Sequence, residues 1–412
     1  MYIGSVFRYN KGTQDCEGGN TWFYYTNCPK LDIATSFVID SSKFLFGYQP
    51  YVQLRSLSSG GLNFAINCTN VHVNATNLRL YGNKGYFGGN AHFYFMLFTS
   101  ISIAIENSYL GAGQASRGAG ALVFIGEDTA VNDKDSCSHH SLHFQNHHQL
   151  MYFSNVTFQE NAAQNSGAGF QIEDRMEPGH WCANQLVVIE NCHFIGNTIN
   201  DSWVGGGAAA RFSSAALSQL VYPSCMKRNI QIQFRNTTFE NNTIHSYESY
   251  PRVFESTLSI ESYVNVTFVN CTFIGNQGSA IYAFQTDIIF QGNNTFHNNS
   301  GKLGAGLSLF VNSFLYLKPH TNLLFSNNKA QYFGGAIFTD LEVEIPGTVL
   351  PCFFQVLKEG LEEQTAVSSI HVEFVNNTAK TAGSSLYGGY LNDCQGLGLP
   401  VSGFDVFKKI FH

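Results

Sequence analysis

The stretch Phe325 to Ile337, FSNNKAQYFGGAI, contains the unit from which most of this chain is built. It reads as an inward-facing aromatic residue, an asparagine corner, a loop and a glycine pair that opens a new apolar strand. Asn322, Phe325 and Asn328 form the triplet N-x-x-F-x-x-N. Asparagine, like glycine, tolerates the left-handed backbone conformation, so we expect an asparagine at each end of the triplet to mark a turn.

The triplet recurs more often than composition allows, which indicates a repeat architecture. Its central residues, expected to stack as a buried column, are Phe158, Phe194, Phe239, Phe273, Phe296 and Phe325. A leucine version adds Leu80, and a last copy, in which His371 stands in place of the first asparagine, adds Phe374. Its second asparagines, expected at the corners, are Asn83, Asn161, Asn197, Asn242, Asn276, Asn299, Asn328 and Asn377. Strand side chains alternate, and six of the eight residues two positions before the central residue are apolar or cysteine. That side of the strand is therefore predicted to face inward.

Small residues follow each triplet, and glycine there allows a sharp bend or a close approach between neighbouring turns of chain. These segments are Gly88 and Gly89, Gly167 to Gly169, Gly205 to Ala208, Gly278 to Ile281, Gly304 to Gly306, Gly334 to Ile337 and Gly383 to Leu386. Successive aromatics from Phe158 to Phe374 are 36, 45, 34, 23, 29 and 49 residues apart. This spacing predicts a coil of roughly 20 to 30 residues per rung, with loops inserted in some rungs.

The motif F-x-x-N followed by G-G-A-[ILV] resembles the repeat of the chlamydial polymorphic outer membrane proteins. Similar repeats occur in large surface proteins of other organisms, including simple animals. Phe325, Asn328 and Gly334 to Ile337 match the motif in full, and most other copies match its first half. The resemblance covers about Asn77 to Leu391. It implies an all-β fold, a right-handed parallel β-helix solenoid displayed outside the cell.

The repeat divides the chain into three parts. Residues 1–60 lack the triplet and are expected to form atypical N-terminal rungs or a cap. Residues 61–391 form the repeat domain, with insertions near 126–150, 173–184 and 341–368. Residues 392–412 form a tail. We recognise neither a signal peptide at the start nor a polar cap at the end, which predicts a piece of a longer polypeptide.

Composition limits the partners. Charged residues make up only 12% and aromatics 14%, and the formal net charge of -7 argues against nucleic acid or an anionic membrane surface. The most apolar run, Phe93 to Ile105, is too short for a membrane span of about 20 residues and is predicted to be a buried strand. Any membrane association is expected through segments outside this chain.

A histidine-rich insertion raises a metal hypothesis, because neighbouring imidazoles ligate zinc or copper. Its histidines are His139, His140, His143, His147 and His148. No carboxylate or cysteine stands at a recognised ligand spacing, so neither a metal site nor another cofactor is predicted.

A second polar insertion, Glu173 to Cys182, gathers acidic residues with Arg175, His180 and Trp181. Paired carboxylates can cleave glycosidic bonds, and a tryptophan can stack on a sugar ring. In enzymes with this fold, however, the reacting groups come from neighbouring rungs, whereas these crowd one loop. No catalytic residue is predicted.

Ten cysteines favour an oxidising compartment. Plausible loop disulfides join Cys16 with Cys28, Cys137 with Cys182, and Cys352 with Cys394, although connectivity stays open. Cys192 and Cys271 each lie two residues before a column aromatic and are predicted to be buried thiols.

Glycosylation sequons are frequent, in agreement with a secreted glycoprotein. They begin at Asn67, Asn74, Asn155, Asn200, Asn236, Asn241, Asn265, Asn270, Asn293, Asn298 and Asn376. A corner asparagine followed by a strand threonine produces the same motif, so both explanations stay open.

The sequence thus favours an extracellular or surface-displayed scaffold for adhesion or recognition of a protein or glycan, without catalysis. The alternatives are a carbohydrate-active β-helix enzyme, either a polysaccharide lyase or a glycoside hydrolase, and a structural spacer. Carboxylates from consecutive rungs that line one groove would favour the enzyme.

Overall fold

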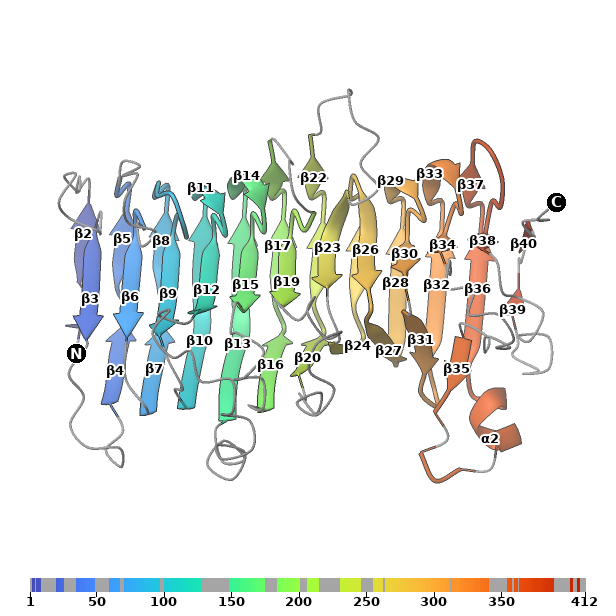
Figure 1. The fold of residues 1–412 in the computed structure, drawn as a ribbon, viewed down its shortest axis with the longest axis horizontal. Coiled ribbons are helices and arrows are strands. Elements are labelled where there is room, and N and C mark those ends of the chain that lie inside the picture. The colour runs from blue at the N-terminus through green and yellow to red at the C-terminus, as the bar shows by residue number, and fades with distance from the viewer. Residues whose placement is uncertain are drawn as a thin grey trace, which may run out of the picture.

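In a computed structural model the chain winds into a right-handed parallel β-helix, and its turns follow one another along the long axis (Figure 1). Among the described residues, twelve turns each contribute one strand to a twelve-stranded sheet. The structure describes residues 2–3, 5–8, 20–25, 35–48, 59–66, 70–96, 100–126, 148–174, 184–200, 206–214, 230–245, 255–261, 264–311, 313–340, 354–357, 359–361, 363–388, 401–402 and 406–407.

One sheet, here called the bent sheet, has two arms joined at a turn in each rung. The first arm contains β1 (Tyr2–Ile3), β4 (Thr35–Asp40), β7 (Asn70–Thr76), β10 (Ser100–Gly111), β13 (His148–Gln159), β16 (Asn184–Glu190), β20 (Ile230–Arg235), β24 (Asn265–Val269), β27 (Asp287–Gln291), β31 (Phe314–Leu317) and β35 (Phe354–Val356). The second arm contains β2 (Val6–Arg8), β5 (Lys43–Leu45), β8 (Arg79–Tyr81), β17 (His193–Ile195), β21 (Thr238–Glu240), β25 (Thr272–Ile274), β28 (Asn293–His297), β32 (Asn322–Ser326), β36 (His371–Val375) and β39 (Val401–Ser402). Strands β10 and β13 run through both arms.

Two further faces complete each rung. The short face contains β11 (Gln114–Arg117), β14 (Ala162–Ser166), β18 (Thr198–Ile199), β22 (Thr243–Ile244), β29 (Ser300–Leu303), β33 (Lys329–Phe333) and β37 (Thr378–Ala379). The twelve-stranded sheet contains β3 (Thr21–Tyr25), β6 (Leu62–Ile66), β9 (Ala91–Met96), β12 (Ala121–Gly126), β15 (Phe170–Asp174), β19 (Ala210–Ser214), β23 (Ser256–Glu261), β26 (Ser279–Phe284), β30 (Leu307–Phe310), β34 (Ile337–Asp340), β38 (Leu386–Gly388) and β40 (Val406–Phe407). In the described part of the chain a single helix, α2 (Glu363–Ser368), is present, and it precedes β36.

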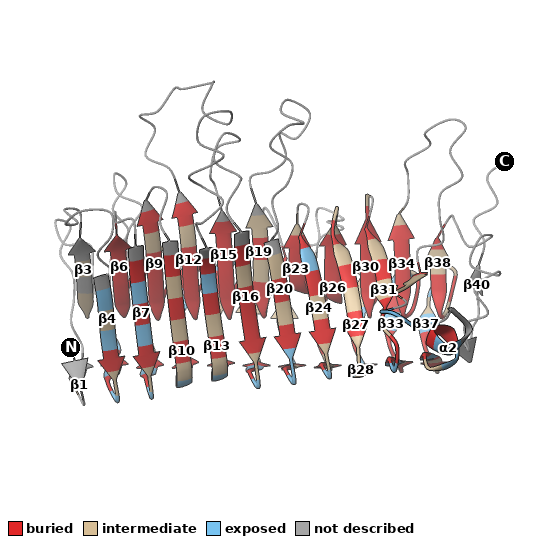
Figure 2. Ribbon diagram, turned by 90° about the horizontal axis from the view of Figure 1, so that it is seen from below, coloured by how far each residue is buried: buried red, intermediate tan, exposed pale blue. Residues whose placement is uncertain are grey.

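The predicted aromatic column is confirmed. Phe158, Phe194, Phe239, Phe273, Phe296, Phe325 and Phe374 are register partners on consecutive rungs. Their ring centroids are 4.5 to 5.2 Å apart, and the rings are within 14° of parallel. Leu80 belongs to the same column through Leu110, which the triplet does not identify. All these side chains are buried, and so are the residues two positions before them. Figure 2 shows that buried residues recur in the strands of successive rungs along the coil.

The role predicted for the second asparagine of each triplet is wrong in one respect. These asparagines do not adopt the left-handed conformation; the residue before each one does, as at Gly82, Glu160, Gly196, Asn241, Gly275, Asn298, Asn327 and Asn376. The preceding turn points the asparagine side chain inward, where its amide bridges two rungs. The first asparagine is left-handed as expected at Asn77, Asn155, Asn191, Asn236 and Asn270, whereas Asn293 and Asn322 lie within strands.

The inward asparagines form a ladder of amides with one direction. The Nδ2 atom of Asn161 donates to Oδ1 of Asn197 at 3.0 Å, and the same bond repeats through Asn242, Asn276, Asn299, Asn328 and Asn377. Each Nδ2 also donates to the carbonyl of the column residue one rung earlier, as from Asn276 to Phe239 at 3.0 Å. A buried amide thereby keeps both its donor and its acceptor paired.

Two rungs have a glycine at the ladder position, and an asparagine from another rung fills the space. A Cβ on Gly113 would lie 2.6 Å from Nδ2 of Asn90. Asn90 spans that rung, accepting from Asn83 and donating to Asn161. Asn20 reaches across the rung of Gly47 in the same way and donates to Asn83 at 2.8 Å. The ladder is therefore continuous from Asn20 to Asn377.

The glycine motif turns the short face into the twelve-stranded sheet. Gly334 has φ +67°, and a Cβ on Gly335 would lie 2.0 Å from the carbonyl oxygen of Ser384 on the next rung. The first position needs a left-handed turn and the second needs a close approach, so both functions expected of glycine occur. In the rung of β19 the motif is Gly207 to Ala210, two residues later than predicted.

The apolar run Phe93 to Ile105 is two strands instead of one. Its first part lies in β9 and its second in β10, on different faces of the coil. In β9 the consecutive residues Ala91, His92 and Phe93 are buried, so this strand is covered on both faces there, whereas β10 buries alternate side chains at Ile101, Ile103 and Ile105.

Candidate functional site

The column and the ladder supply the scaffold, because their side chains are buried and paired with one another. Outward-pointing residues must therefore supply any binding site. Residues at equivalent positions on neighbouring rungs lie about 4.8 Å apart, so each outward position forms a row along the coil axis. Two such regions gather polar chemistry: one on the twelve-stranded sheet and one on the short face.

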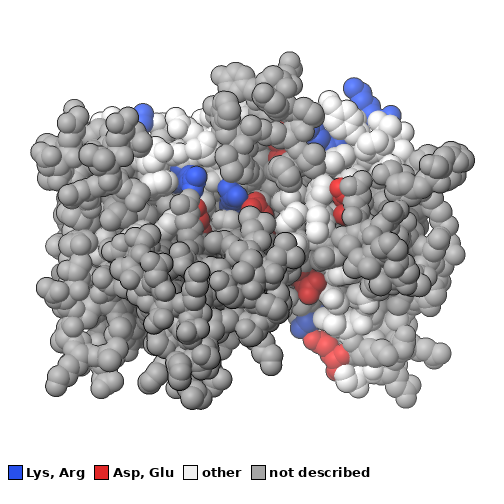
Figure 3. All heavy atoms as spheres, in the orientation of Figure 1, with Lys and Arg blue, Asp and Glu red and all other residues white. Residues whose placement is uncertain are grey.

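A row of ion pairs between rungs, here called the charged row, lies on the twelve-stranded sheet and along its border with the short face, which supplies Arg117 and Lys302. Arg117 donates to both carboxylate oxygens of Glu173, at 3.0 and 3.1 Å. Arg211 pairs with Glu261 at 3.0 Å, and Lys302 pairs with Glu255 at 2.6 Å. Basic and acidic groups accordingly lie next to one another on the face that Figure 3 shows.

Glu173 and Glu261 of the charged row each have both carboxylate oxygens hydrogen-bonded. Glu173 also accepts from Gln171 at 3.1 Å, and Glu261 accepts from Ser259 at 2.9 Å. Glu173 and Glu261 hold the same register position with Ser213 between them, so two rung spacings, roughly 10 Å, separate their backbones. A sugar hydroxyl or a water that bound to either carboxylate would compete with these arginine, glutamine and serine donors.

Two buried titratable groups border the same sheet. His92 is 1% exposed beside the rings of Phe87 and Tyr94, and burial lowers the pKa of its imidazole to about 3. Burial, followed by the charge of Glu261, raises the pKa of the Tyr282 hydroxyl above its ordinary value. Both groups are held in their neutral forms near neutral pH, as expected for structural positions in an apolar setting.

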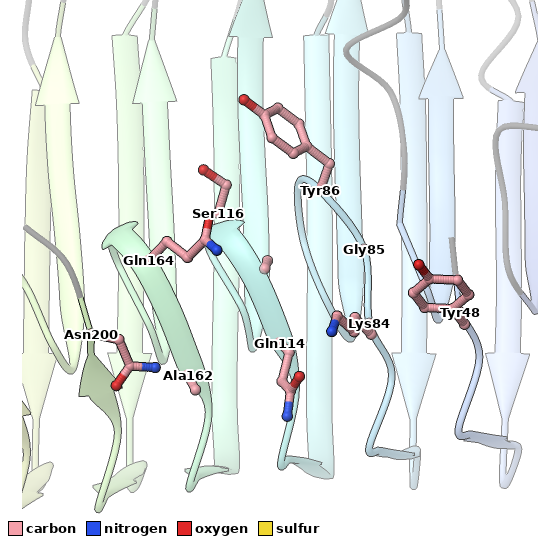
Figure 4. Close-up of a pocket in the computed structure, with 10 residues that line it drawn as sticks. Tyr48, Lys84, Gly85, Tyr86, Gln114, Ser116, Ala162, Gln164 and Asn200 are labelled. Carbon is pink, nitrogen blue, oxygen red and sulfur yellow. The ribbon is translucent and has the colours of Figure 1, made fainter. Parts of the chain in front are cut away.

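The short face carries an open groove, here called the tyrosine groove, with a volume of about 530 Å³. Its lining comes from successive rungs and consists of Tyr48, Lys84, Gly85, Tyr86, Gln114, Ala115, Ser116, Ala162, Gln164 and Asn200 (Figure 4). Gly85 has no side chain and Ala162 has only a methyl group, so no large side chain fills the groove at these two positions. None of these lining residues is aspartate or glutamate.

Two rows border the tyrosine groove. Tyr48, Lys84, Gln114 and Ala162 are register partners in one row, and Tyr86, Ser116, Gln164 and Asn200 lie two residues further along each rung. Tyr48 is 39% exposed, and Nζ of Lys84 lies 6.0 Å from the centroid of its ring. The rings of Tyr86 and Phe87 pack edge to face, with their centroids 4.6 Å apart, and this contact restrains the ring of Tyr86. The groove thus offers aromatic faces, side-chain amides and one cation.

Sequence reasoning missed this groove because its other lining residues are 36 to 152 positions from Tyr48 and share no sequence motif of their own. Only the register of the coil brings them together. One available signal was the offset from the ladder: Lys84 and Ala162 each follow a ladder asparagine directly, and Gln114 follows the glycine at that position.

Several predicted sites lie outside the described residues: the cysteines proposed for disulfides (Cys16, Cys28, Cys137, Cys182, Cys352 and Cys394), four of the five histidines of the insertion (His139, His140, His143 and His147), and Arg175, His180, Trp181 and Asn67. For His148 the structure describes only its place in β13. Within the described part, no three His, Cys, Asp or Glu side chains are grouped to hold a metal ion. No described helix is long and apolar enough to cross a membrane.

The two cysteines predicted to be buried thiols are confirmed. Cys192 and Cys271 are free and fully buried, and burial raises the pKa of each thiol to about 12. Ten sequon asparagines fall among the described residues, and all ten are exposed: Asn74, Asn155, Asn200, Asn236, Asn241, Asn265, Asn270, Asn293, Asn298 and Asn376. None of the ladder asparagines begins a sequon.

Parallel pairing throughout, stacked aromatics and a continuous internal amide ladder define the class of this protein as a right-handed parallel β-helix. A family model described as "right handed beta helix region" matches residues 179–340, where the triplets are most regular. Comparison with curated proteins and with solved structures found no match.

Proposed function

We propose that this chain is a recognition or adhesion scaffold, displayed outside the cell, that binds its ligand on an outer face and catalyses no reaction. The observation that carries the proposal is the tyrosine groove, whose described lining residues combine the exposed ring of Tyr48, the partly exposed ring of Tyr86 and side-chain amides with no carboxylate. Enzymatic cleavage of sugars requires a positioned acid and base or nucleophile. A site without such groups is suited to binding alone.

The extracellular placement rests on the sequons, the cysteine content and the resemblance to polymorphic outer membrane protein repeats. The exposed sequon asparagines would accept glycans without disturbing the buried ladder. Labelling intact cells with a membrane-impermeant biotin reagent tests the placement. Absence of label on the chain, with a surface protein labelled in the same sample, would contradict it.

The absence of catalysis is tested by incubating the purified chain with soluble polysaccharides. We expect no new reducing ends and no unsaturated products, while binding is detected by affinity electrophoresis. Cleavage that disappears in Glu173→Gln or Glu261→Gln would overturn the proposal.

A second candidate, a carbohydrate-active enzyme, is favoured by one observation: Glu173 and Glu261 share a register position on one outer face. In that case Arg117 or Arg211 would have to release its carboxylate when substrate binds. The variant Glu173→Gln separates the two functions. If the chain is an enzyme, this variant abolishes cleavage; if the chain binds its ligand in the tyrosine groove, binding is unchanged.

A further inference from the structure

The direction in which the tyrosine groove runs indicates which class of ligand it can bind. The groove crosses the strands, so neighbouring lining residues are one rung apart, about 4.8 Å. Its lining extends from Tyr48 to Asn200 over successive rungs (Figure 4). A ligand that used both ends would be an extended, repetitive chain lying along the coil axis.

The backbone around the groove disfavours an extended peptide. Proteins usually hold such peptides by adding a strand to a free sheet edge. Here the backbone is already paired between rungs: Gly85 donates to the carbonyl of Gln114 at 3.0 Å, and Ala162 donates to that of Gly113 at 2.8 Å. The ligand would therefore meet side chains, with no free strand edge to extend.

The side chains match a sugar chain. The amides of Gln114, Gln164 and Asn200 both donate and accept, as the hydroxyl groups of a sugar do. Tyr48 and Tyr86 add aromatic faces that suit the apolar face of a pyranose ring. Rings and amides in rows offer these contacts repeatedly along the axis.

The charge of the site and of the chain disfavours a strongly anionic polymer. Among the described lining residues only Lys84 carries a full charge at neutral pH. The whole chain has a formal net charge of -7. A polyanion would gain one ion pair and meet the negative field of the protein. An uncharged chain avoids that repulsion and still receives a hydrogen bond from Lys84.

We infer that the tyrosine groove binds an extended, uncharged polysaccharide, stacked on Tyr48 and Tyr86 and hydrogen-bonded to Gln114, Gln164, Asn200 and Lys84. This inference rests on the proposed function and names its ligand. Because Asn200 begins a sequon, the test uses full-length chain from the periplasm of a bacterium that lacks N-glycosylation.

Affinity electrophoresis and isothermal titration would measure binding to three neutral probes, a mixed-linkage β-glucan, a xylan and a mannan, with polygalacturonate as the acidic comparator. We expect one or more neutral probes to bind, with an affinity that salt does not change. Tyr86→Ala should weaken that binding roughly tenfold or more, as removal of a central aromatic does at binding sites. Gln164→Ala should weaken it less.

The chain contains matched controls on the same face. Lys329 occupies the row of Lys84, and Tyr332 is 40% exposed in β33, seven rungs beyond Tyr86. Lys329→Ala and Tyr332→Ala should leave binding unchanged. Equal losses in Tyr86→Ala and Tyr332→Ala, preference for polygalacturonate, or binding of no neutral probe would overturn the inference.

The two proposals fail differently. Neutral-polymer binding that survives Tyr86→Ala would refute the tyrosine groove as the site and leave the recognition scaffold in place. Cleavage of a bound polymer would refute the non-catalytic function whichever surface binds.

Discussion

At the scale of single residues, Phe273 and Asn276 stabilise the same rung by different means. Phe273 is fully buried and stacks between Phe239 and Phe296, at 4.5 and 4.7 Å. Asn276 contributes hydrogen bonds in a place where water cannot reach. The aromatic column supplies apolar burial, and the amide ladder keeps the turns of chain in register.

Replacing Phe273 with alanine should lower the free energy of unfolding by about 3 to 5 kcal/mol, the usual cost of a phenylalanine-sized cavity. Urea denaturation followed by circular dichroism measures the loss. Tyr332→Ala, at an exposed position, should change the midpoint little. Similar losses for both variants would contradict the buried column.

Replacing Asn276 with alanine removes four hydrogen bonds. Its Nδ2 donates to Phe239 and Asn299, and its Oδ1 accepts from the backbone and the side chain of Asn242. Each bond contributes about 1 kcal/mol, and unpaired partners add to the cost, so we expect a loss of roughly 3 to 4 kcal/mol or more. The control is Asn265→Ala, on the exposed side of β24. Equal urea midpoints for Asn276→Ala and Asn265→Ala would contradict a stabilising role of the ladder.

The buried imidazole of His92 should make stability depend on acid. Burial lowers its folded-state pKa from 6.5 to about 3. Below pH 6.5 the unfolded chain takes up a proton on this group and the folded chain does not, so stability is lost as the pH falls towards 3. His92→Leu should flatten the dependence of the urea midpoint on pH in that window. The control is His245→Leu, at an exposed position, which should leave the pH dependence of the urea midpoint as it is in the unmodified protein. If His92→Leu also leaves that dependence unchanged, burial of His92 does not contribute to the loss of stability in acid.

At the scale of elements, the turn between β33 and β34 fixes where the short face ends. Gly334 meets two requirements there: φ is +67°, and a Cβ would lie 2.2 Å from the carbonyl oxygen of Ile337. Gly360 shares only the first requirement, because φ is +86° and nothing lies within 4 Å of the place that a Cβ would occupy.

Gly334→Ala should therefore destabilise the protein more than Gly360→Ala. The second variant carries only the cost of a left-handed alanine, about 1 to 2 kcal/mol. The first adds a backbone clash that the turn can relieve only by moving β34. Thermal unfolding of both variants measures the difference, and equal melting temperatures would show that the turn has room to adjust.

At the scale of the whole molecule, stability should be nearly additive over rungs, because most contacts of each turn are with its immediate neighbours. The shortest repeat separates Asn276 from Asn299 by 23 residues and carries no long insertion. Deletion of Asn270 to Gly292 removes one complete turn and joins β24 to β28. Phe239 would then stack on Phe296, and Asn242 would bond to Asn299.

We expect this deletion variant to fold cooperatively with a β-sheet circular dichroism spectrum and a lower melting temperature. Deletion of Asn270 to Ala280 removes half a turn and joins β24 to a strand of another sheet. That variant should be unfolded. A folded half-turn deletion, or an unfolded full-turn deletion, would contradict the rung assignment.

The repeat made much of this fold predictable. N-x-x-F-x-x-N identified six members of the central column, and two variant copies added Leu80 and Phe374, together with their corners and the inward positions before them. It missed Leu110 because Gly113 replaces the asparagine in that rung and Asn90, from another turn, supplies the amide. It also misassigned the left-handed residue, because asparagine serves both as a turn residue and as a buried amide, and a sequence does not distinguish the two.

The sequence by itself determined that equivalent aromatics would stack as the chain winds, because a side-chain period of two and recurrent turns allow few other ways to bury them. Only the tertiary structure decided which outward residues meet. The tyrosine groove and the pairing of Arg117 with Glu173 depend on loop lengths that vary from rung to rung. Register across rungs, set by backbone hydrogen bonds between distant segments, brings those residues within reach of one another.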